Sequence, residues 1–227
     1  MVTSSRHKQL QKGLFLNIHC TSLKLEKRFA SIHRIADLAW EEKKIVFEIQ
    51  CSFIEKTEVV RRVKDYASIG YSVIWLLDDN CFGKRYQNHA EALMQDLGAK
   101  YITLSKHSVL VYDQVENHVG RLKIKKHSFS TVEIQNPYLR IKAPTTPKQI
   151  PKELYSRWHQ TDYIFPGDLL DQMVNNTLLR LPSRKKDYIR TTKRFFLRMR
   201  RYSSFFFHYF LTHLHQNEEK EKNSNIF

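Results

Sequence analysis

The stretch RIADLAWEEKKIVFEIQCS, residues 34–52, decides the predicted fold. Between Ser31 and Trp40 the side chains alternate in the manner of a β-strand. The polar run at 41–44 indicates a turn, and residues 45–51, rich in β-branched and aromatic side chains, indicate a second strand antiparallel to the first. The pattern therefore predicts a β-hairpin.

Helices are predicted on both sides of this hairpin. Apolar residues recur at a roughly fourfold spacing between His7 and Thr21, which indicates a helix with one face against a sheet. After the hairpin, a helical period runs from a predicted N-cap at Thr57 to a stop at Gly70. The apolar residues 72–77 that follow predict a buried central strand.

A further helix is predicted over His89 to Leu97, followed by a strand pair over 100–104 and 108–112. This order of elements predicts an α/β domain with a mixed sheet flanked by helices over residues 1–115. We expect a strand-like segment and linker over 116–150, and a helical, basic and aromatic-rich extension with a frayed tail over 151–227.

Composition favours a polyanionic partner. The chain has 227 residues, is 41% hydrophobic and 27% charged, and carries a formal net charge of +15. Such an excess of Lys and Arg attracts nucleic acid first and an anionic membrane surface second, while a basic surface without a partner is the plain alternative.

Other sequence features bound the compartment. The cysteines at 20, 51 and 81 form no CxxC pair and are expected to be reduced. The start lacks the apolar core of a secretion signal, and no apolar run approaches the ~20 residues of a membrane helix. We therefore expect a cytoplasmic protein with no transmembrane segment.

The predicted hairpin brings three polar side chains together. Asp37 would face the strand that carries Glu48 and Gln50, which share one face because side chains repeat every two residues. A carboxylate pair supplies the oxygen ligands that Mg²⁺ prefers, and such an ion activates water and neutralises a phosphodiester. Gln50 stands where Lys is usual, and it orients water without supplying charge.

The spacing alone is a weak signal, because acidic residues near hairpins are common. The structural alternative places all three side chains on a solvated face of the sheet. Glu48 and Gln50, however, stand in an otherwise apolar strand, where a half-buried polar group needs a functional or a paired reason to exist.

Several further residues carry a family resemblance. The pattern Arg34-x-Ala-Asp37, then Glu48-x-Gln50-x-Ser52, then a helix with Arg61 and Tyr66 and an apolar strand with a Trp, resembles the nuclease domain of the CoiA-like competence proteins. The match covers roughly residues 31–80.

The resemblance implies a restriction-endonuclease-like, PD-(D/E)xK fold and a role in DNA processing during natural transformation. It implies Mg²⁺ or Mn²⁺ held by Asp37 and Glu48, with Gln50 as the third catalytic residue. Arg34 is expected to support the carboxylates or a phosphate, and Ser52 to cap the turn. Arg61 and Tyr66 are expected either to face DNA or to pack, and Arg61 and Arg62 are candidate DNA contacts.

This chain departs from the family pattern at its start. Family members resemble E-S-x-x-H in the first helix, whereas here Thr3 stands where the acid falls, and Ser4 and His7 are retained. The missing carboxylate puts a second metal position in doubt. His7 is expected at the surface or as a capping residue rather than as a ligand. A Cys-rich start is also absent, so the chain is either a shortened relative or begins further upstream.

The C-terminal extension has its own basic signal. From Arg184 to Arg201 a single acid, Asp187, stands among basic residues, and a DNA-contacting face is expected there. The residues assigned to this face are Arg184, Lys185, Lys186, Arg190, Lys193, Arg194 and Arg198. The interleaved aromatics recur at helical spacing, which favours core or partner contacts over base stacking.

The sequence thus predicts metal-dependent hydrolysis of DNA, in uptake or recombination, together with other competence or recombination proteins as partners. A DNA-binding module of the same fold without cleavage is the alternative. A peripheral membrane factor using the basic aromatic helix is a third interpretation.

Overall fold

The computed structural model describes residues 4–175, except 85, 107, 115, 120–121, 126–128, 144–145 and 148. Its centre is a seven-stranded sheet with the order β1-β2-β3-β4-β5-β6-β9. The strands are β1 (Leu23–Phe29), β2 (Arg34–Trp40), β3 (Ile45–Gln50), β4 (Ser72–Asp78), β5 (Lys100–Leu104), β6 (Val109–Asp113) and β9 (Ser130–Thr131).

The sheet is mixed. Strands β1, β2 and β3 pair antiparallel, β4 lies parallel to both β3 and β5, and β6 pairs antiparallel with β5 and β9. Parallel neighbours need a crossover, and α2 (Lys56–Ser68) and α4 (His89–Asp96) supply the two that flank β4. The predicted α/β class with a helix-flanked mixed sheet is confirmed.

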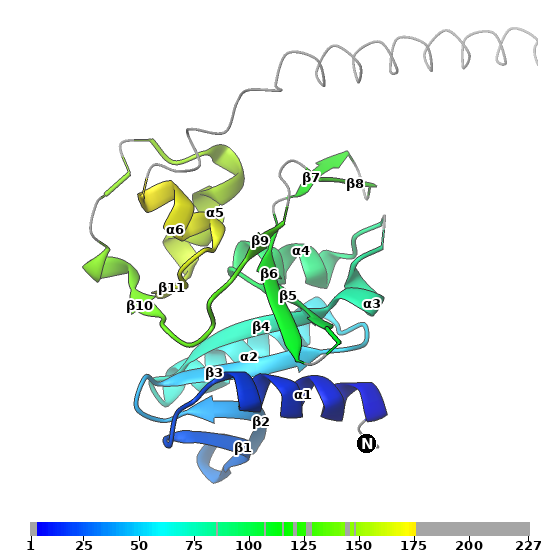
Figure 1. Ribbon diagram of the computed structural model, residues 1–227, viewed down its shortest axis with the longest axis vertical. Coiled ribbons are helices and arrows are strands. Elements are labelled where there is room, and N and C mark those ends of the chain that lie inside the picture. Colours follow the sequence, from blue (N-terminus) through cyan, green and yellow to red (C-terminus); the bar gives the residue numbers. More distant parts are fainter. Residues whose placement is uncertain are drawn as a thin grey trace, which may run out of the picture. The chain divides into compact units, whose positions relative to one another are not determined.

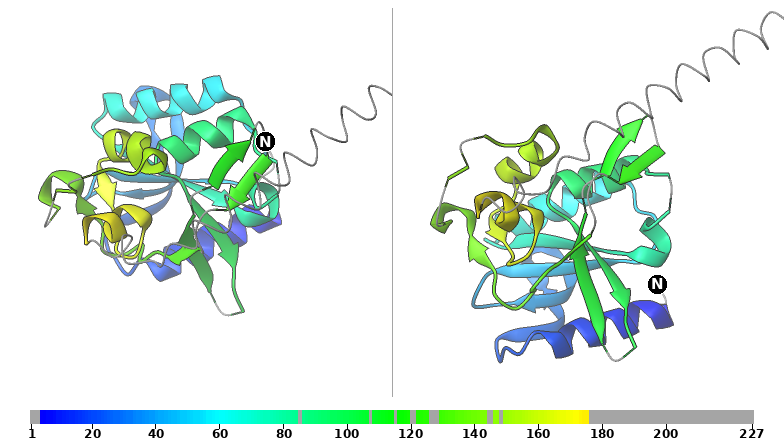
Figure 2. Two further views of the ribbon diagram at one scale, coloured as in Figure 1. Left: turned by 90° about the horizontal axis from the view of Figure 1, so that it is seen from above. Right: turned by 45° about the horizontal axis from the view of Figure 1, so that its top comes forward.

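Helices cover both faces of this sheet. Helix α1 (Ser5–Asn17) lies on one face, and α2 and α4 lie on the other, which is plainest in the view from above (Figures 1 and 2). Helix α1 begins where the Ser4 hydroxyl accepts the N–H of His7, and it buries Leu10 and Leu14 against the sheet. The fourfold spacing of its apolar residues is therefore the spacing of its buried face.

Alternation along β3 distributes its side chains between the two layers. Phe47 and Ile49 pack in the cluster beneath α1, together with Leu76 of β4. Val46 packs on the other side of the sheet with Tyr66 of α2. Glu48 shares the α2 side with Val46, because side chains two residues apart in a strand point the same way.

The predicted first residue of the hairpin is wrong, because strand β2 begins at Arg34. Strand character was expected from Ser31, but residues Ala30–Ile32 form a 3-10 turn that ends at His33 in the left-handed region, with φ of 51°. The preceding edge strand β1 was not predicted. Its charged, exposed residues hide the alternation, and Glu26 interrupts its pairing with φ of 48°.

The N-cap predicted at Thr57 is also wrong. Helix α2 begins at Lys56, with Glu55 at the N-cap position and no side-chain cap hydrogen bond. Thr57 therefore lies inside the first turn. The end predicted at Gly70 fits the structure, since α2 stops at Ser68 and Gly70 has a φ of 77° that favours glycine.

Smaller elements complete the described part of the chain. They are α3 (Asp79–Phe82), the hairpin β7 (Glu116–Val119) and β8 (Leu122–Lys125), β10 (Tyr138–Leu139), a 3-10 turn (Arg140–Lys142), α5 (Lys152–Gln160), β11 (Tyr163–Ile164) and α6 (Leu169–Val174). Helices α5 and α6 share a small core built around Leu154, Ile164 and Leu170.

A buried ionic cluster ties this small core to the sheet. The carboxylate of Asp113 at the end of β6 accepts hydrogen bonds from Lys100 of β5, Arg157 of α5 and the N–H of Leu169. The domain boundaries expected at residues 115 and 150 stay a prediction. The part of the predicted helical extension beyond residue 175 and the basic face from Arg184 to Arg198 lie outside the described residues.

Within the part of the chain that the structure describes, no helix is both long enough and apolar enough to cross a bilayer.

Candidate active site

The site is built where β2 and β3 separate. Their pairing runs from Trp40 opposite Ile45 to Leu38 opposite Phe47, and one further step in this register sets Asp37 opposite Glu48. At that step the Asp37 carboxylate accepts a hydrogen bond from the N–H of Ile49, with Oδ2 at 2.7 Å from the nitrogen. The side chain of Asp37 is thereby fixed where the two strands separate, and its charge is close enough to Glu48 to act on the pKa of that acid.

Glu48 is the buried acid of the site. Its side chain is 4% exposed, and its oxygens accept hydrogen bonds from two residues of α2: the Tyr66 hydroxyl at 2.7 Å and the Arg62 guanidinium at 2.5 Å. Burial raises the pKa of Glu48 to about 7, Asp37 acts in the same direction, and Arg62 and Tyr66 oppose the rise. The carboxyl group therefore titrates near neutral pH in the absence of a bound cation.

Gln50 lies at the end of β3, two residues beyond Glu48. Its amide nitrogen donates to the carbonyl of Ser52 at 2.6 Å, which ties the side chain to the turn that leaves the strand. Ser52 was predicted to cap this turn, and its backbone carbonyl is the group that holds Gln50. The amide oxygen is the end of Gln50 that can accept a hydrogen bond from water.

Helix α1 also reaches the site, through contacts of two of its residues with Asp37 that were not predicted. The His7 imidazole lies 3.1 Å from Oδ2 of Asp37, and the Gln11 amide donates to the Asp37 carbonyl at 3.0 Å. The hydrogen bond to Asp37 raises the pKa of His7. His7 was expected at the surface or as a cap, yet its side chain is only 14% exposed.

The signal for His7 was present in the sequence. Ser4 caps the helix on the N–H of His7, so this pair fixes where the first turn begins. In that turn Arg6 also reaches the sheet, with both oxygens of Asp78 at 2.7 Å. The contacts of His7 with Asp37 and of Arg6 with Asp78 could not be read from spacing, because each joins residues that lie far apart in the chain.

Arg34 lies beside α2 and not at the carboxylates. Its guanidinium pairs with Glu58 at 2.8 Å and with Asp65 at 2.7 Å. Of the two other arginines considered, Arg61 pairs with Glu58 and is 67% exposed, whereas Arg62 joins Glu58 to Glu48. A row of ion pairs therefore runs along α2 into the site.

Glu58 is the acid shared by this row. Partial burial acts to raise its pKa, but its contacts with Arg61, Arg62 and Arg34 outweigh that effect and lower the pKa to about 2. Glu58 thus remains ionised at any physiological pH and offers Arg62 a second partner. Arg62 can release Glu48 without being left unpaired.

The carboxylate oxygens of Asp37 and Glu48 are ligands of the kind that a hard divalent cation prefers, but they are few. Asp37 and Glu48 are carboxylates that influence one another electrostatically, and each carboxylate oxygen has lone pairs beyond those used in one hydrogen bond. Among the residues that the structure describes, no group of three or more His, Cys, Asp or Glu side chains is arranged to hold an ion. Mg²⁺ is commonly held by one or two carboxylates, with water and substrate phosphate completing its shell.

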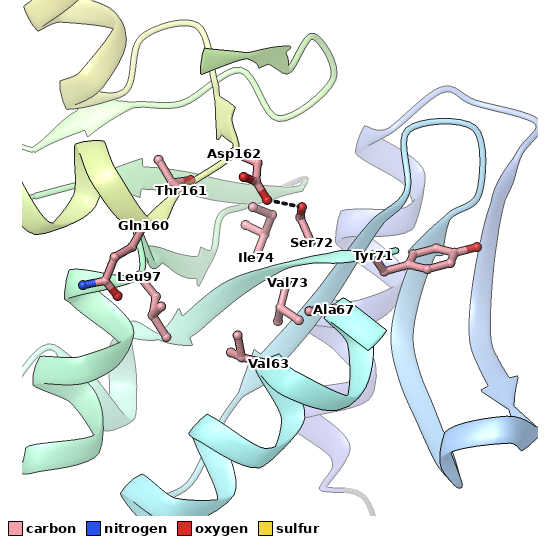
Figure 3. A pocket seen from close by; sticks show the side chains of 10 residues that line it. All are labelled: Val63, Ala67, Tyr71, Ser72, Val73, Ile74, Leu97, Gln160, Thr161 and Asp162. Carbon is pink, nitrogen blue, oxygen red and sulfur yellow. Dashed lines mark hydrogen bonds between the residues drawn. The ribbon is translucent and has the colours of Figure 1, made fainter. Parts of the chain in front are cut away.

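A cavity of about 90 Å³ lies away from these carboxylates. It is lined by the second half of α2, the start of β4 and the end of α5, where the Ser72 hydroxyl donates to Asp162 at 2.6 Å (Figure 3). None of Asp37, Glu48 and Gln50 lines this cavity, so it does not contribute to the site.

The chain matches a known protein family. Residues 4–145 match the family model described as competence protein CoiA, nuclease-like domain. No curated protein matches the chain. No solved structure matches it either.

Proposed function

The chain belongs to the competence protein CoiA family and carries its nuclease-like domain, and on this premise we propose that it hydrolyses phosphodiester bonds of DNA with a divalent cation, Mg²⁺ or Mn²⁺. The observation that carries the proposal is the fixed position of Asp37 on the Ile49 N–H, beside the buried carboxylate of Glu48. An ionisable group buried among apolar side chains is costly and is typical of functional sites.

In this proposal Asp37 and Glu48 hold the cation, which supplies Lewis acidity toward a phosphate oxygen and toward water. Tyr66 orients the Glu48 carboxylate through its hydrogen bond, and the Ile49 N–H orients that of Asp37. Gln50, held at Ser52, orients the attacking water through its amide oxygen. As an amide it adds no positive charge, so charge on the phosphate must be neutralised by other groups.

Arg62 and His7 are positioned to supply that charge. Each is bound to one of the two acids, Arg62 to Glu48 and His7 to Asp37. A cation at the acids would compete for both carboxylates and free these groups to face a phosphate. Glu58 would keep Arg62 close to the site, because the Arg62 guanidinium already forms an ion pair with Glu58.

The proposed substrate is DNA handled during uptake and recombination. A net charge of +15 attracts the phosphate backbone over a long range at moderate salt. The basic residues at 184–198 would add affinity without sequence preference, and other competence or recombination proteins are expected as partners.

One observation favours a second candidate function, a module of this fold that binds DNA without cutting it. The first turn of α1 contains no acid, so this helix offers no further carboxylate to a cation. Both oxygens of Glu48 are also engaged by α2. In this alternative the arginine stays on Glu48, and DNA binds through basic side chains alone.

A cleavage assay separates the two functions. The full chain is incubated with labelled single-stranded and double-stranded DNA in EDTA, Mg²⁺ or Mn²⁺, beside Glu48→Gln and Asp37→Asn. We expect divalent-dependent cleavage that both variants lose, while the control Glu133→Gln, an exposed acid near β9, keeps it. DNA binding without cleavage in either metal would establish the second function.

A further inference from the structure

Exposed aromatic rings stand at the end of the sheet where the candidate site lies. Phe53 is 64% exposed and occupies the segment between β3 and α2, three residues after Gln50. Three residues span at most about 11 Å, so the ring stays within a nucleotide or two of the site. Tyr86, 66% exposed, follows α3 at the end of the neighbouring strand β4.

The exposure of Phe53 is not the result of a loose loop. Its neighbour Ile54 packs into the core beneath α2, and its own ring meets the buried Phe82 edge to face, with centroids 5.8 Å apart. The loop before it is tied by the hydrogen bond from Gln50 to Ser52. The ring is therefore held with much of its surface in water, an arrangement that costs free energy and that packing does not require.

Basic groups surround this end of the sheet. Arg6 of α1 is held on Asp78, and Lys84 follows α3 with an exposed side chain. Arg62 lies on Glu48. A nucleic-acid strand entering the site would thus meet cations for its phosphates and an aromatic face for its bases, the two components that bind unpaired strands.

We propose that Phe53 stacks on an unpaired base next to the scissile phosphodiester, so that the substrate is single-stranded DNA or a DNA end whose strands have separated. The inference rests on the proposed nuclease function for the location of the scissile bond, but not for the stacking. A base inside a duplex has both faces covered by its neighbours and offers none to the ring. The ring therefore discriminates between paired and unpaired DNA.

Binding measured without cleavage tests the stacking by itself. Fluorescence anisotropy in EDTA gives the affinity of the full chain for a labelled single strand and for the same sequence as a blunt duplex. One base stack contributes roughly 1–3 kcal/mol, so Phe53→Ala should weaken single-strand binding by about 5- to 150-fold and duplex binding by less than about twofold. Phe53→Tyr should bind both as the native chain does.

A matched control and a base-removal series complete the test. Tyr155→Ala removes another aromatic side chain, 58% exposed on α5, and should leave both affinities unchanged. Abasic sites placed one at a time along the single strand should weaken binding to the native chain at one position, and that position should make no difference to Phe53→Ala.

Each outcome decides the matter. Equal losses on single strand and duplex, or no loss, or an abasic effect that persists in Phe53→Ala, would overturn the stacking. Selective loss with no cleavage by the native chain in Mg²⁺ or Mn²⁺ would keep the stacking and refute the nuclease. Cleavage that depends on Glu48, with DNA affinity indifferent to Phe53, would do the reverse.

Discussion

The carboxylate of Asp37 accepts the backbone N–H of Ile49 at 2.7 Å, where a β-ladder would otherwise continue. An acid side chain has thus replaced a strand carbonyl as the partner of β3. The same oxygen also faces His7 at 3.1 Å, so the position of Asp37 is set by the sheet and by α1 together. Asp37 therefore has a structural role, as the hydrogen-bond acceptor of Ile49, and a proposed role as a ligand of the cation. Conservative substitutions can distinguish these two roles.

Asp37→Asn should separate the two roles. The amide oxygen still accepts from Ile49, so the fold should persist, but the negative charge needed to hold a divalent cation is gone. We expect Mn²⁺ binding by calorimetry to weaken strongly and cleavage to fall at least about 100-fold, as when a group acting in the transition state is removed. Asp37→Ala should in addition lose roughly 1–3 kcal/mol of stability, because the Ile49 N–H is left unpaired.

The outcome that refutes this assignment is specific. Asp37→Asn with unchanged Mn²⁺ affinity would show that the carboxylate is structural only. The control Asp96→Asn, at the end of α4 and outside the site, should match the native chain in metal affinity and in unfolding free energy.

The raised pKa of Glu48 makes a prediction about pH. The folded value is about 7 and the ordinary value is 4.5, so between them the folded state binds more protons than the unfolded state. Stability contributed by this group is therefore fully present below 4.5 and is lost as pH rises through 7. Relative to Glu48→Gln, the native chain without metal should lose roughly 1–3 kcal/mol between pH 5 and pH 8.

Urea unfolding of both proteins in EDTA at several pH values measures this difference. Adding Mn²⁺ at pH 8 should stabilise the native chain and leave Glu48→Gln unchanged, since ligands stabilise only the state they bind. A difference between the two proteins that is constant with pH would mean that Glu48 is ionised throughout and that Arg62 compensates its burial.

Tyr66→Phe tests the partner of that acid. The hydroxyl lies 2.7 Å from Glu48, and a hydrogen bond to a charged group contributes roughly 1.5–3 kcal/mol. We expect destabilisation by about this amount at pH 8 and by less at pH 5, where Glu48 is protonated. Tyr71→Phe is the matched control, because this ring also packs edge to face on Phe29. Equal effects of Tyr66→Phe at both pH values would show that the hydroxyl does not act on the ionised form of Glu48.

Much of the central fold followed from local pattern. Alternation fixed the hairpin of β2 and β3, helical period fixed α2, and the unbroken apolar run of β4 marked a strand buried on both faces. Edge strand β1 did not follow, because exposed charged residues conceal its alternation. Local pattern predicts the elements whose burial is periodic.

The site was predictable only in part, for a related reason. The residues Asp37, Glu48 and Gln50 belong to one hairpin, whose pairing ends one step before Asp37 and Glu48, so the first two were predicted to lie in the same region. The contacts of His7 with Asp37 and of Arg62 with Glu48 depend on how α1 and α2 lie on the sheet. No spacing rule sets these positions, and so Arg34 was expected at the carboxylates that Arg62 reaches.

Removing the Asp113 carboxylate, far from the proposed chemistry, is expected to cost much stability. Burial acts to raise its pKa, yet Arg157 and Lys100 outweigh burial and hold the pKa below its usual range. In Asp113→Asn an amide N–H₂ would face one of the groups that now donate to the carboxylate. The buried positive charges of Lys100 and Arg157 would also lose the negative charge that balances them. Breaking a buried ion pair in this way costs roughly 3–5 kcal/mol, and thermal unfolding should register it.

Coupling identifies the cause of that loss. If the uncompensated guanidinium is responsible, Arg157→Met added to Asp113→Asn should recover part of the lost stability rather than add to it. Arg157 also donates to the backbone carbonyl of Gln95 on α4, so recovery should be incomplete. Losses that simply add would locate the cost in packing between α5 and α4, and the ionic account of this cluster would then be wrong.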